Sequence, residues 1–209
     1  MGLTDLSVKD YAQRVADDSP TPGGGSASAL AGGLGAALCL MVAHLTVGRE
    51  KYRTVWADME ALSRSAGELL TCSLELAERD PEAYDGVLSA FKLPKETDAE
   101  RETRRQSVEA AIKQAALVPL ETLRTMSKLT DFVEQAIEKG NPNCLCDAAV
   151  AVQLIRASAM GAAYNVRVNL GSIADKDFSY RTRSEMTSLK NNILLAVGRL
   201  EARIEELMA

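Results

Sequence analysis

The sequence predicts an all-α fold, and three observations support this class. Apolar residues recur along most of the chain with the three- and four-residue spacing of amphipathic helices. Aromatic residues make up only 4% of the 209 residues, which favours closely packed helices over a β core. The alternating pattern typical of strands is absent. We therefore expect one helical domain over residues 1–209, a bundle of six or seven helices of which some are long and kinked.

The first two helices are separated by a segment that cannot be helical. Ser7 is placed to cap a helix over "VKDYAQRVADD", whose apolar positions share one face. The following "SPTPGGG" ends it, because two prolines and three glycines do not continue a helix. Ser26 is then placed to cap a second helix that runs to about Gly48, a residue suited to the C-terminal cap.

The third helix starts near Thr54 and contains a proline. Asp80 and Pro81 predict an interruption there, with Pro81 either kinking the helix or starting a new one at its first position. Asp80 would then lie at a helix start and could face a cleft. Further on, Pro94 predicts a non-helical link.

The second half of the chain predicts three more helices. Thr97 and Glu100 have the spacing of a capping box, which starts a long helix reaching Lys139, with a bend near Pro119. Asp147 can cap the next helix, "AAVAVQLIRASAMGAAYNVRVN". A last amphipathic helix covers about residues 177–208, with its apolar side chains on one face.

Charge and cysteine content limit the class of protein. The formal charge of −5 offers no general attraction for phosphates, so we expect no nucleic-acid partner. The N-terminus has no basic and apolar pattern of a signal peptide, and together with four cysteines this predicts a reduced, cytoplasmic protein. Cys144 and Cys146 have no second ligand pair, so we expect no metal site.

The stretch "TPGGGSASALAGGLGAALCLMVAHLTVG" allows three interpretations. It is long enough for a membrane span, but its glycines and alanines contribute little transfer free energy and no basic flank precedes it. We therefore expect a buried central helix and no membrane partner. The "PGGGS" start matches no nucleotide loop, although its amide groups could receive an anion or a carbonyl. A turn that only permits close packing explains the same glycines.

Several motifs in one order suggest a family. The chain contains "PTPGGGSASALAGGLGAALCLMVAHLTVGREKY", then "ERDPEAYDGVLSAFKLPKETDAER", "ALVPLE", "GNPNCLCDAAVAV" and "GAAYNVRVNLGSI". This series resembles the formiminotetrahydrofolate cyclodeaminase and methenyltetrahydrofolate cyclohydrolase family over most of residues 5–178. The resemblance implies an all-α homodimer that needs no metal and no cofactor beyond its tetrahydrofolate substrate.

The resemblance also implies an acid–base reaction at the one-carbon unit. A positioned carboxyl group can give a proton to departing ammonia or take one from attacking water. The catalytic acidic residue of the family falls at Asp80. A helix-capping role for Asp80 explains the same residue without any chemistry.

The family match implies further contacts to the folate. The substrate-binding candidates are Pro22, Gly23, Gly24, Gly25, Ser26, Asp147 and Asn165. Asp147 also suits a helix cap, and Cys146 stands where the family pattern has serine. His44, the only histidine, is expected to be buried and hydrogen-bonded.

A folate can carry several glutamates, which calls for a local group of cations in an acidic protein. The candidates are Arg49, Lys51, Arg53, Lys92 and Lys95, and Lys51 ranks first because it belongs to the first matched motif. Each also suits a solvated face. Three arginines of the long helix, at positions 101, 104 and 105, are expected to form a solvated face without a role.

The expected activity is the conversion of 5-formiminotetrahydrofolate to 5,10-methenyltetrahydrofolate with release of ammonia. Hydrolysis of the methenyl form to 10-formyltetrahydrofolate is a close alternative, and neither composition nor spacing separates the two. A folate-binding helical module without catalytic activity is the alternative from another class.

Overall fold

The computed structural model describes residues 2–209 and confirms the all-α class. This part of the chain contains no strand, six α-helices and three short 3-10 helices, one before the first α-helix and two between α-helices. The α-helices are α1 (Val8–Ala16), α2 (Gly24–His44), α3 (Trp56–Phe91), α4 (Asp98–Lys139), α5 (Leu145–Leu170) and α6 (Lys176–Met208). The 3-10 helices are Leu3–Asp5, Glu50–Val55 and Pro142–Cys144.

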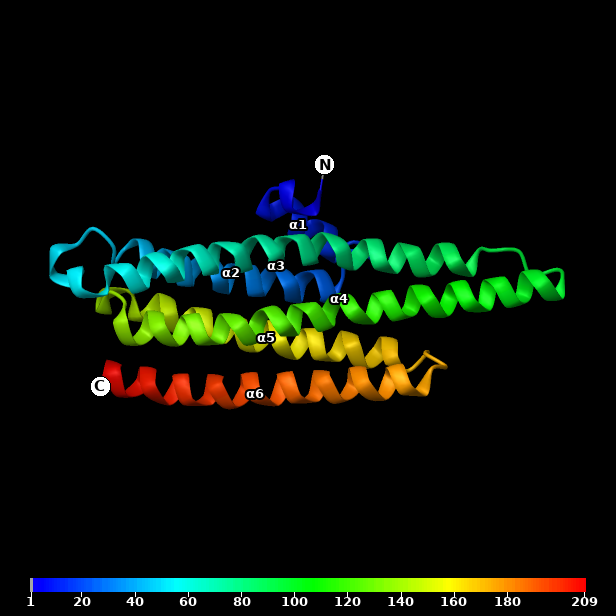
Figure 1. The fold of residues 1–209 in the computed structure, drawn as a ribbon. Coiled ribbons are helices and arrows are strands. Elements are labelled where there is room, and N and C mark those ends of the chain that lie inside the picture. Colours follow the sequence, from blue (N-terminus) through cyan, green and yellow to red (C-terminus); the bar gives the residue numbers. More distant parts are fainter. Residues whose placement is uncertain (1) are drawn as a thin grey trace.

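The five long helices lie side by side in an elongated bundle (Figure 1). The pair α3 and α4 extends past the start of α2, and the loop that joins them forms one end of the molecule. The C-terminus lies at the other end. The N-terminal segment with α1 lies outside the bundle beside α3, where the Glu78 carboxylate accepts hydrogen bonds from the amides of Leu3 and Thr4.

The glycine- and alanine-rich helix α2 is the central element, as predicted. It packs against α3, α4 and α5. A Cβ at Gly32 would overlap the side chains of Met126 and Ser158, and one at Gly35 would lie 3.4 Å from the Ala151 carbonyl oxygen. The missing side chains thus let three helices approach α2 closely. The described residues leave the fourth side of α2 uncovered, as the 53% exposure of Leu34 on that side shows.

Several predicted helix ends are confirmed. The Ser7 hydroxyl accepts a hydrogen bond from the Asp10 amide at the start of α1. Thr97 and Glu100 form the predicted capping box of α4. Helix α6 starts at Lys176, close to the predicted position, and the Asp175 carboxylate caps it.

Two predicted caps are wrong. Gly23 occupies the N-cap position of α2, and Ser26 is the third helical residue. Cys144 occupies the N-cap position of α5, and Asp147 lies inside the first turn, where its charge favours the helix dipole. Helix α2 ends at His44, while Gly48, with φ of +80°, lies in the turn that follows.

The prediction that a new helix starts at Pro81 is also wrong, and the alternative, a kink at Pro81, stays a prediction. Helix α3 runs without a break over 36 residues with Pro81 inside it. Helix α4 likewise contains Pro119 within 42 residues, and the bend expected there stays a prediction. An interior proline leaves the carbonyl four residues earlier without its helical donor. The two freed carbonyls both lie near the candidate site described below.

Two helical segments, Gly24–His44 and Pro142–Leu170, are long and apolar enough to cross a membrane by length and composition. The core helices of soluble proteins pass the same criterion. In the most apolar 18-residue window of each segment, 50% and 39% of the residues are buried inside the fold.

Candidate active site

The N-terminal end of α2 binds a carboxylate of the same chain. The Ser26 amide donates a hydrogen bond of 2.9 Å to Oδ2 of Asp80 on α3. A Cβ at Gly25 would overlap the same carboxylate. The glycine run therefore serves two purposes, since it leaves room for Asp80 and presents an amide at the positive end of the helix dipole.

The interior proline of α3 is compensated by Ser26. Pro81 has no N–H to donate to the carbonyl of Ala77, and the Ser26 hydroxyl donates to that oxygen instead, at 2.8 Å. Because the only proton of this hydroxyl is used, the hydroxyl of Tyr11 donates to Ser26 Oγ, at 3.0 Å. Ser26 thus joins α1, α2 and α3 and fixes the turn of α3 that carries Asp80.

The interior proline of α4 is compensated in the same way. Pro119 frees the carbonyl of Ala115, and the side-chain amide of Asn169 on α5 donates to it, at 2.8 Å. Asn165, one turn earlier on α5, donates to the carbonyl of Gly161 at 2.9 Å. Its Oδ1 atom makes no hydrogen bond with the described residues.

These groups surround a pocket of about 240 Å³ between α2, α3, α4 and α5. It brings together five residues predicted from the sequence, Gly23, Gly24, Gly25, Asp80 and Asn165. The remaining lining residues are Pro20, Thr21, Tyr84, Ala115, Val168 and Asn169. Segments far apart in the sequence thus meet around one carboxyl group.

The Asp80 carboxyl is half-buried in this pocket. Burial raises its pKa above the ordinary value, and the hydrogen bond from the Ser26 amide opposes part of that rise. Only Oδ2 has a partner among residues 2–209. Oδ1 is therefore available to exchange a proton with a bound molecule, and its raised pKa moves it toward the range useful for acid–base catalysis.

Two predicted residues lie next to this pocket. Ser26 is fully buried behind Asp80 and acts through the contacts given above. Pro22 is buried and lines a neighbouring hollow together with Pro81.

The other predicted residues lie elsewhere in the chain. Lys51 follows the far end of α2, about 30 Å from the glycines, and its ammonium lies 4.5 Å from the ring of Tyr52. Asp147 lies about 27 Å from Asn165 along α5. Lys92 and Lys95 are exposed beyond the end of α3.

His44 is not buried, contrary to expectation. It ends α2 on the exposed surface, and its Nε2 shares a hydrogen bond of 2.9 Å with the Ser63 hydroxyl. Sequence reasoning also missed Tyr11 and Tyr84. The spacing of Tyr84, four residues after Asp80, puts both on one helix face, a signal that the assumed break at Pro81 concealed.

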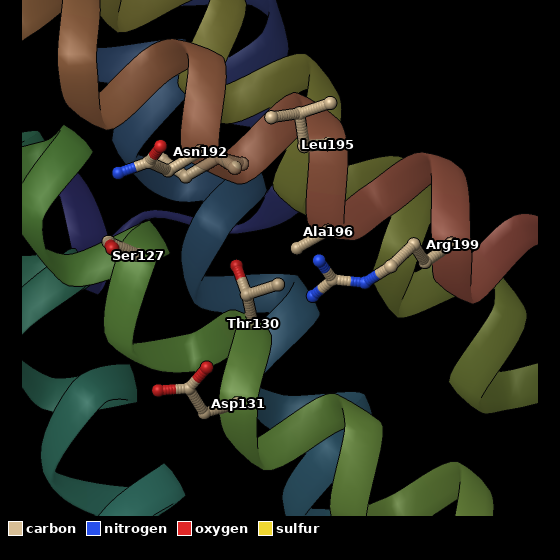
Figure 2. A pocket seen from close by; sticks show the side chains of 8 residues that line it. Ser127, Thr130, Asp131, Asn192, Leu195, Ala196 and Arg199 are labelled. Atoms are coloured by element: carbon tan, nitrogen blue, oxygen red, sulfur yellow. The ribbon is translucent and has the colours of Figure 1, made fainter.

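A second hollow of about 250 Å³ lies between α4 and α6 (Figure 2). Ser127, Thr130 and Asp131 line it from α4, and Asn192 and Arg199 from α6. None of the predicted site residues reaches it, and its charged side chains are exposed. Within the described residues, no group of three or more His, Cys, Asp or Glu side chains could hold a metal ion.

Comparison with known proteins identifies the family of this chain. The family model described as formiminotransferase-cyclodeaminase matches residues 7–188. A methenyltetrahydrofolate cyclohydrolase from Methylorubrum extorquens is 39% identical over 201 residues, which cover 96% of this chain and 94% of the relative. A formimidoyltransferase-cyclodeaminase from Rattus norvegicus is 35% identical over 210 residues, and this chain spans 38% of its length.

A solved structure shows the same fold. The crystal structure of formiminotetrahydrofolate cyclodeaminase from Thermotoga maritima aligns with a TM-score of 0.89 and 29% identity, over 99% of this chain and all of the other. The chain therefore belongs to the formiminotransferase-cyclodeaminase family, whose relatives named here are folate enzymes. The family expected from the motifs is confirmed.

Proposed function

We propose that this protein converts 5-formiminotetrahydrofolate to 5,10-methenyltetrahydrofolate with release of ammonia. One observation carries the proposal: a half-buried carboxyl, Asp80, lies in a pocket with one oxygen bound to the Ser26 amide and the other without a donor among residues 2–209. Such a group can move a proton between two atoms of one bound molecule. The full-length likeness to the Thermotoga cyclodeaminase supports this choice.

The proton balance of this reaction needs one carboxylate. N10 attacks the carbon of the formimino group, which reacts in its protonated formiminium form, and Asp80 takes the N10 proton as the tetrahedral carbon forms. Asp80 then returns that proton to the amino nitrogen, whose bond to carbon breaks, and ammonia leaves. The product is the methenyl cation. Asn165, with its free Oδ1, is placed to accept a hydrogen bond from the pteridine or from the leaving nitrogen.

Hydrolysis of the methenyl form is the second candidate, favoured by the Methylorubrum relative of nearly the same length. Here water attacks the methenyl carbon and gives a proton to Asp80. Asp80 delivers it to N5 as the C–N5 bond breaks, the adduct hydroxyl loses its proton to solvent, and 10-formyltetrahydrofolate forms. Both reactions use the same carboxylate in the same place.

The absorbance of the methenyl chromophore distinguishes these reactions. Its appearance from 5-formiminotetrahydrofolate would support the deaminase, and its accelerated loss from the methenyl form would support the hydrolase. A protein that binds folate but catalyses neither reaction would be a binding module. Neither reaction as written requires a cofactor, and we propose that the enzyme uses none beyond its folate.

We also propose that the protein is a homodimer through the uncovered side of α2. The partly exposed residues of this side are apolar and follow helical spacing: Ala27, Leu30, Ala31, Leu34, Leu38 and Met41. Exposed apolar residues of α5 extend the same surface, including Val150, Tyr164 and Val168. A continuous apolar surface of this kind marks an interaction site.

The surface suits a twofold axis at Leu34. Leu34 is the midpoint of α2 and its most exposed large side chain, so two copies can pack antiparallel with self-complementary contacts. Val168 lines the Asp80 pocket, and a partner on this surface would therefore cover the pocket edge. The partner's Lys51, which follows the far end of its α2, would then approach this pocket.

Light scattering tests the dimer. Leu34→Arg is expected to convert a dimer to a monomer at micromolar concentration, whereas Leu195→Arg, at a 67% exposed leucine of α6, is expected to leave the mass unchanged. A monomeric wild type would contradict the proposal. We further propose a cytoplasmic location, supported by four cysteines that are all unpaired in the structure.

A further inference from the structure

A pocket rich in arginine lies at the start of α4, outside the site described above. Arg101, Arg104 and Arg105 line it together with Phe91, the last residue of α3. Its volume is about 400 Å³, and apolar side chains line it together with Glu109, whose carboxylate pairs with Lys113. The sequence had suggested a solvated helix face at these arginines.

This pocket and the Asp80 pocket lie next to each other, and we call the two together the groove. On α4, Ile112 lines the arginine pocket and Ala115, one turn further, lines the Asp80 pocket. Asn169, near the end of α5, lines the Asp80 pocket, and Ser172, three residues later in the following loop, lines the arginine pocket. Residues three or four apart share a helix face, so the two pockets are neighbours along one side of the bundle.

Helix α3 forms one wall of this groove. Asp80, Tyr84, Leu88 and Phe91 follow at intervals of four, four and three residues, and the last three are 39%, 37% and 48% exposed. Figure 1 shows that this part of α3 extends past the start of α2. The wall between the carboxyl and the arginines is thus an aromatic and apolar strip, about 16 Å long.

Arg104 is the arginine of this pocket that has no carboxylate partner among residues 2–209. Arg101 pairs with Asp98, and Arg105 with Glu102. The Nε–H of Arg104 donates to the Phe91 carbonyl at 3.2 Å, and the guanidinium lies 5.5 Å from the Phe91 ring. The side chain is half-buried and held in place, while its two Nη groups are open to an anion.

We propose that Arg104 binds a carboxylate of the glutamate tail of the folate whose one-carbon unit lies at Asp80. The inference rests on the proposed function. The order of groups along the groove matches the order along the ligand: the acid–base carboxyl, then Tyr84 and Leu88 for the p-aminobenzoyl ring, then the cation. Phe91, whose carbonyl holds Arg104, lies about 16 Å from Asp80 along α3, so the arginine serves tails of several glutamates more than a single one.

Binding of two stable ligands tests this site. We would measure dissociation constants of 5-formyltetrahydrofolate with one and with three γ-linked glutamates by isothermal titration calorimetry. The wild type is expected to bind the triglutamate about tenfold more tightly, the size of one charge-assisted hydrogen bond. Arg104→Gln is expected to remove most of this difference with little effect on the monoglutamate. Arg104→Lys retains part of it.

Arg64→Gln is the matched control, because Arg64 is an exposed arginine of α3 outside both pockets. An intact triglutamate preference in Arg104→Gln, or none in the wild type, would overturn the inference while the proposed function stands. Absence of binding to both folates in the wild type would overturn both.

Discussion

The two ends of α2 are held by polar contacts of opposite kinds. At the far end, each side-chain polar atom of the buried Asn141 has a partner, since its Nδ2 donates to the Leu45 carbonyl and its Oδ1 accepts from Tyr52 and from the Asn143 amide. Its backbone amide donates to Thr46 Oγ1. At the glycine end, Asp80 has a single protein donor. A closed network stabilises the fold, whereas an incomplete one in a pocket leaves an atom for a ligand.

The glycine end of α2 is expected to determine the reaction rate and the Asn141 end the stability, and substitutions at each end test this difference. Changes at the glycine end should lower the reaction rate, and changes at the Asn141 end should lower the free energy of unfolding.

The largest effect is expected for Asp80→Asn. The amide keeps the size of the side chain and a carbonyl oxygen for the Ser26 amide, but it cannot exchange a proton. The turnover number should fall by about 10²- to 10⁴-fold, as measured from the methenyl absorbance, with substrate binding retained. A variant as fast as the wild type would show that Asp80 is not the acid–base group.

Gly25→Ala should lower both the turnover number and the free energy of unfolding. The added methyl group occupies the place of the Asp80 carboxylate, so the carboxylate must move and the turnover number should fall at least tenfold. The free energy of unfolding should decrease by about 1–3 kcal/mol, measured by urea denaturation.

Gly67→Ala is the matched control for that substitution. Gly67 lies inside α3 with open space where its Cβ would be, and alanine should stabilise the helix by about 0.5–1 kcal/mol. Equal effects of the two substitutions would mean that the Gly25 position has no special relation to Asp80.

Asn141→Ala should lower stability and leave catalysis intact. The substitution leaves the Tyr52 hydroxyl and the Leu45 carbonyl without their partner, which costs about 2–3 kcal/mol. The turnover number per folded molecule should stay within about twofold of the wild type when measured well below the unfolding transition. A large loss of rate in a stable variant would place this end in the active site.

The smallest expected effect is a change of the free energy of unfolding with pH. Burial raises the pKa of Asp80 above its unfolded value, so the native state holds this proton more tightly. Stability must then fall as pH rises from about 4 to the raised pKa, because the native state binds more protons than the unfolded state in that interval. Asp80→Asn should therefore gain stability relative to the wild type over the same interval in urea titrations. A difference that stays constant with pH would exclude a raised pKa.

Local sequence signals predicted most of the fold. The Ser7 cap, the Thr97 capping box and the close-packing glycines of α2 depend on neighbouring residues or on side-chain size. Such features follow from helix chemistry and are visible in one segment at a time.

The site was predicted only in part. Asp80, Gly23–Gly25 and Asn165 meet in the pocket, and their motifs pointed to them. Lys51 and Asp147 came from the same motifs but lie at the other end of the helices. A motif gives the order of residues along the chain, not the length of helix that separates them in space.

By itself, the sequence determined an all-α bundle, the family and the acidic residue in its pocket. Only the tertiary structure decided that α3 continues through Pro81, because the hydroxyl that satisfies the Ala77 carbonyl comes from Ser26 on another helix. The tertiary structure also decided which group binds at the glycine-rich start of α2. The amide at the start of α2 binds Asp80, 54 residues away in the chain, and no local pattern specifies a contact between residues so distant.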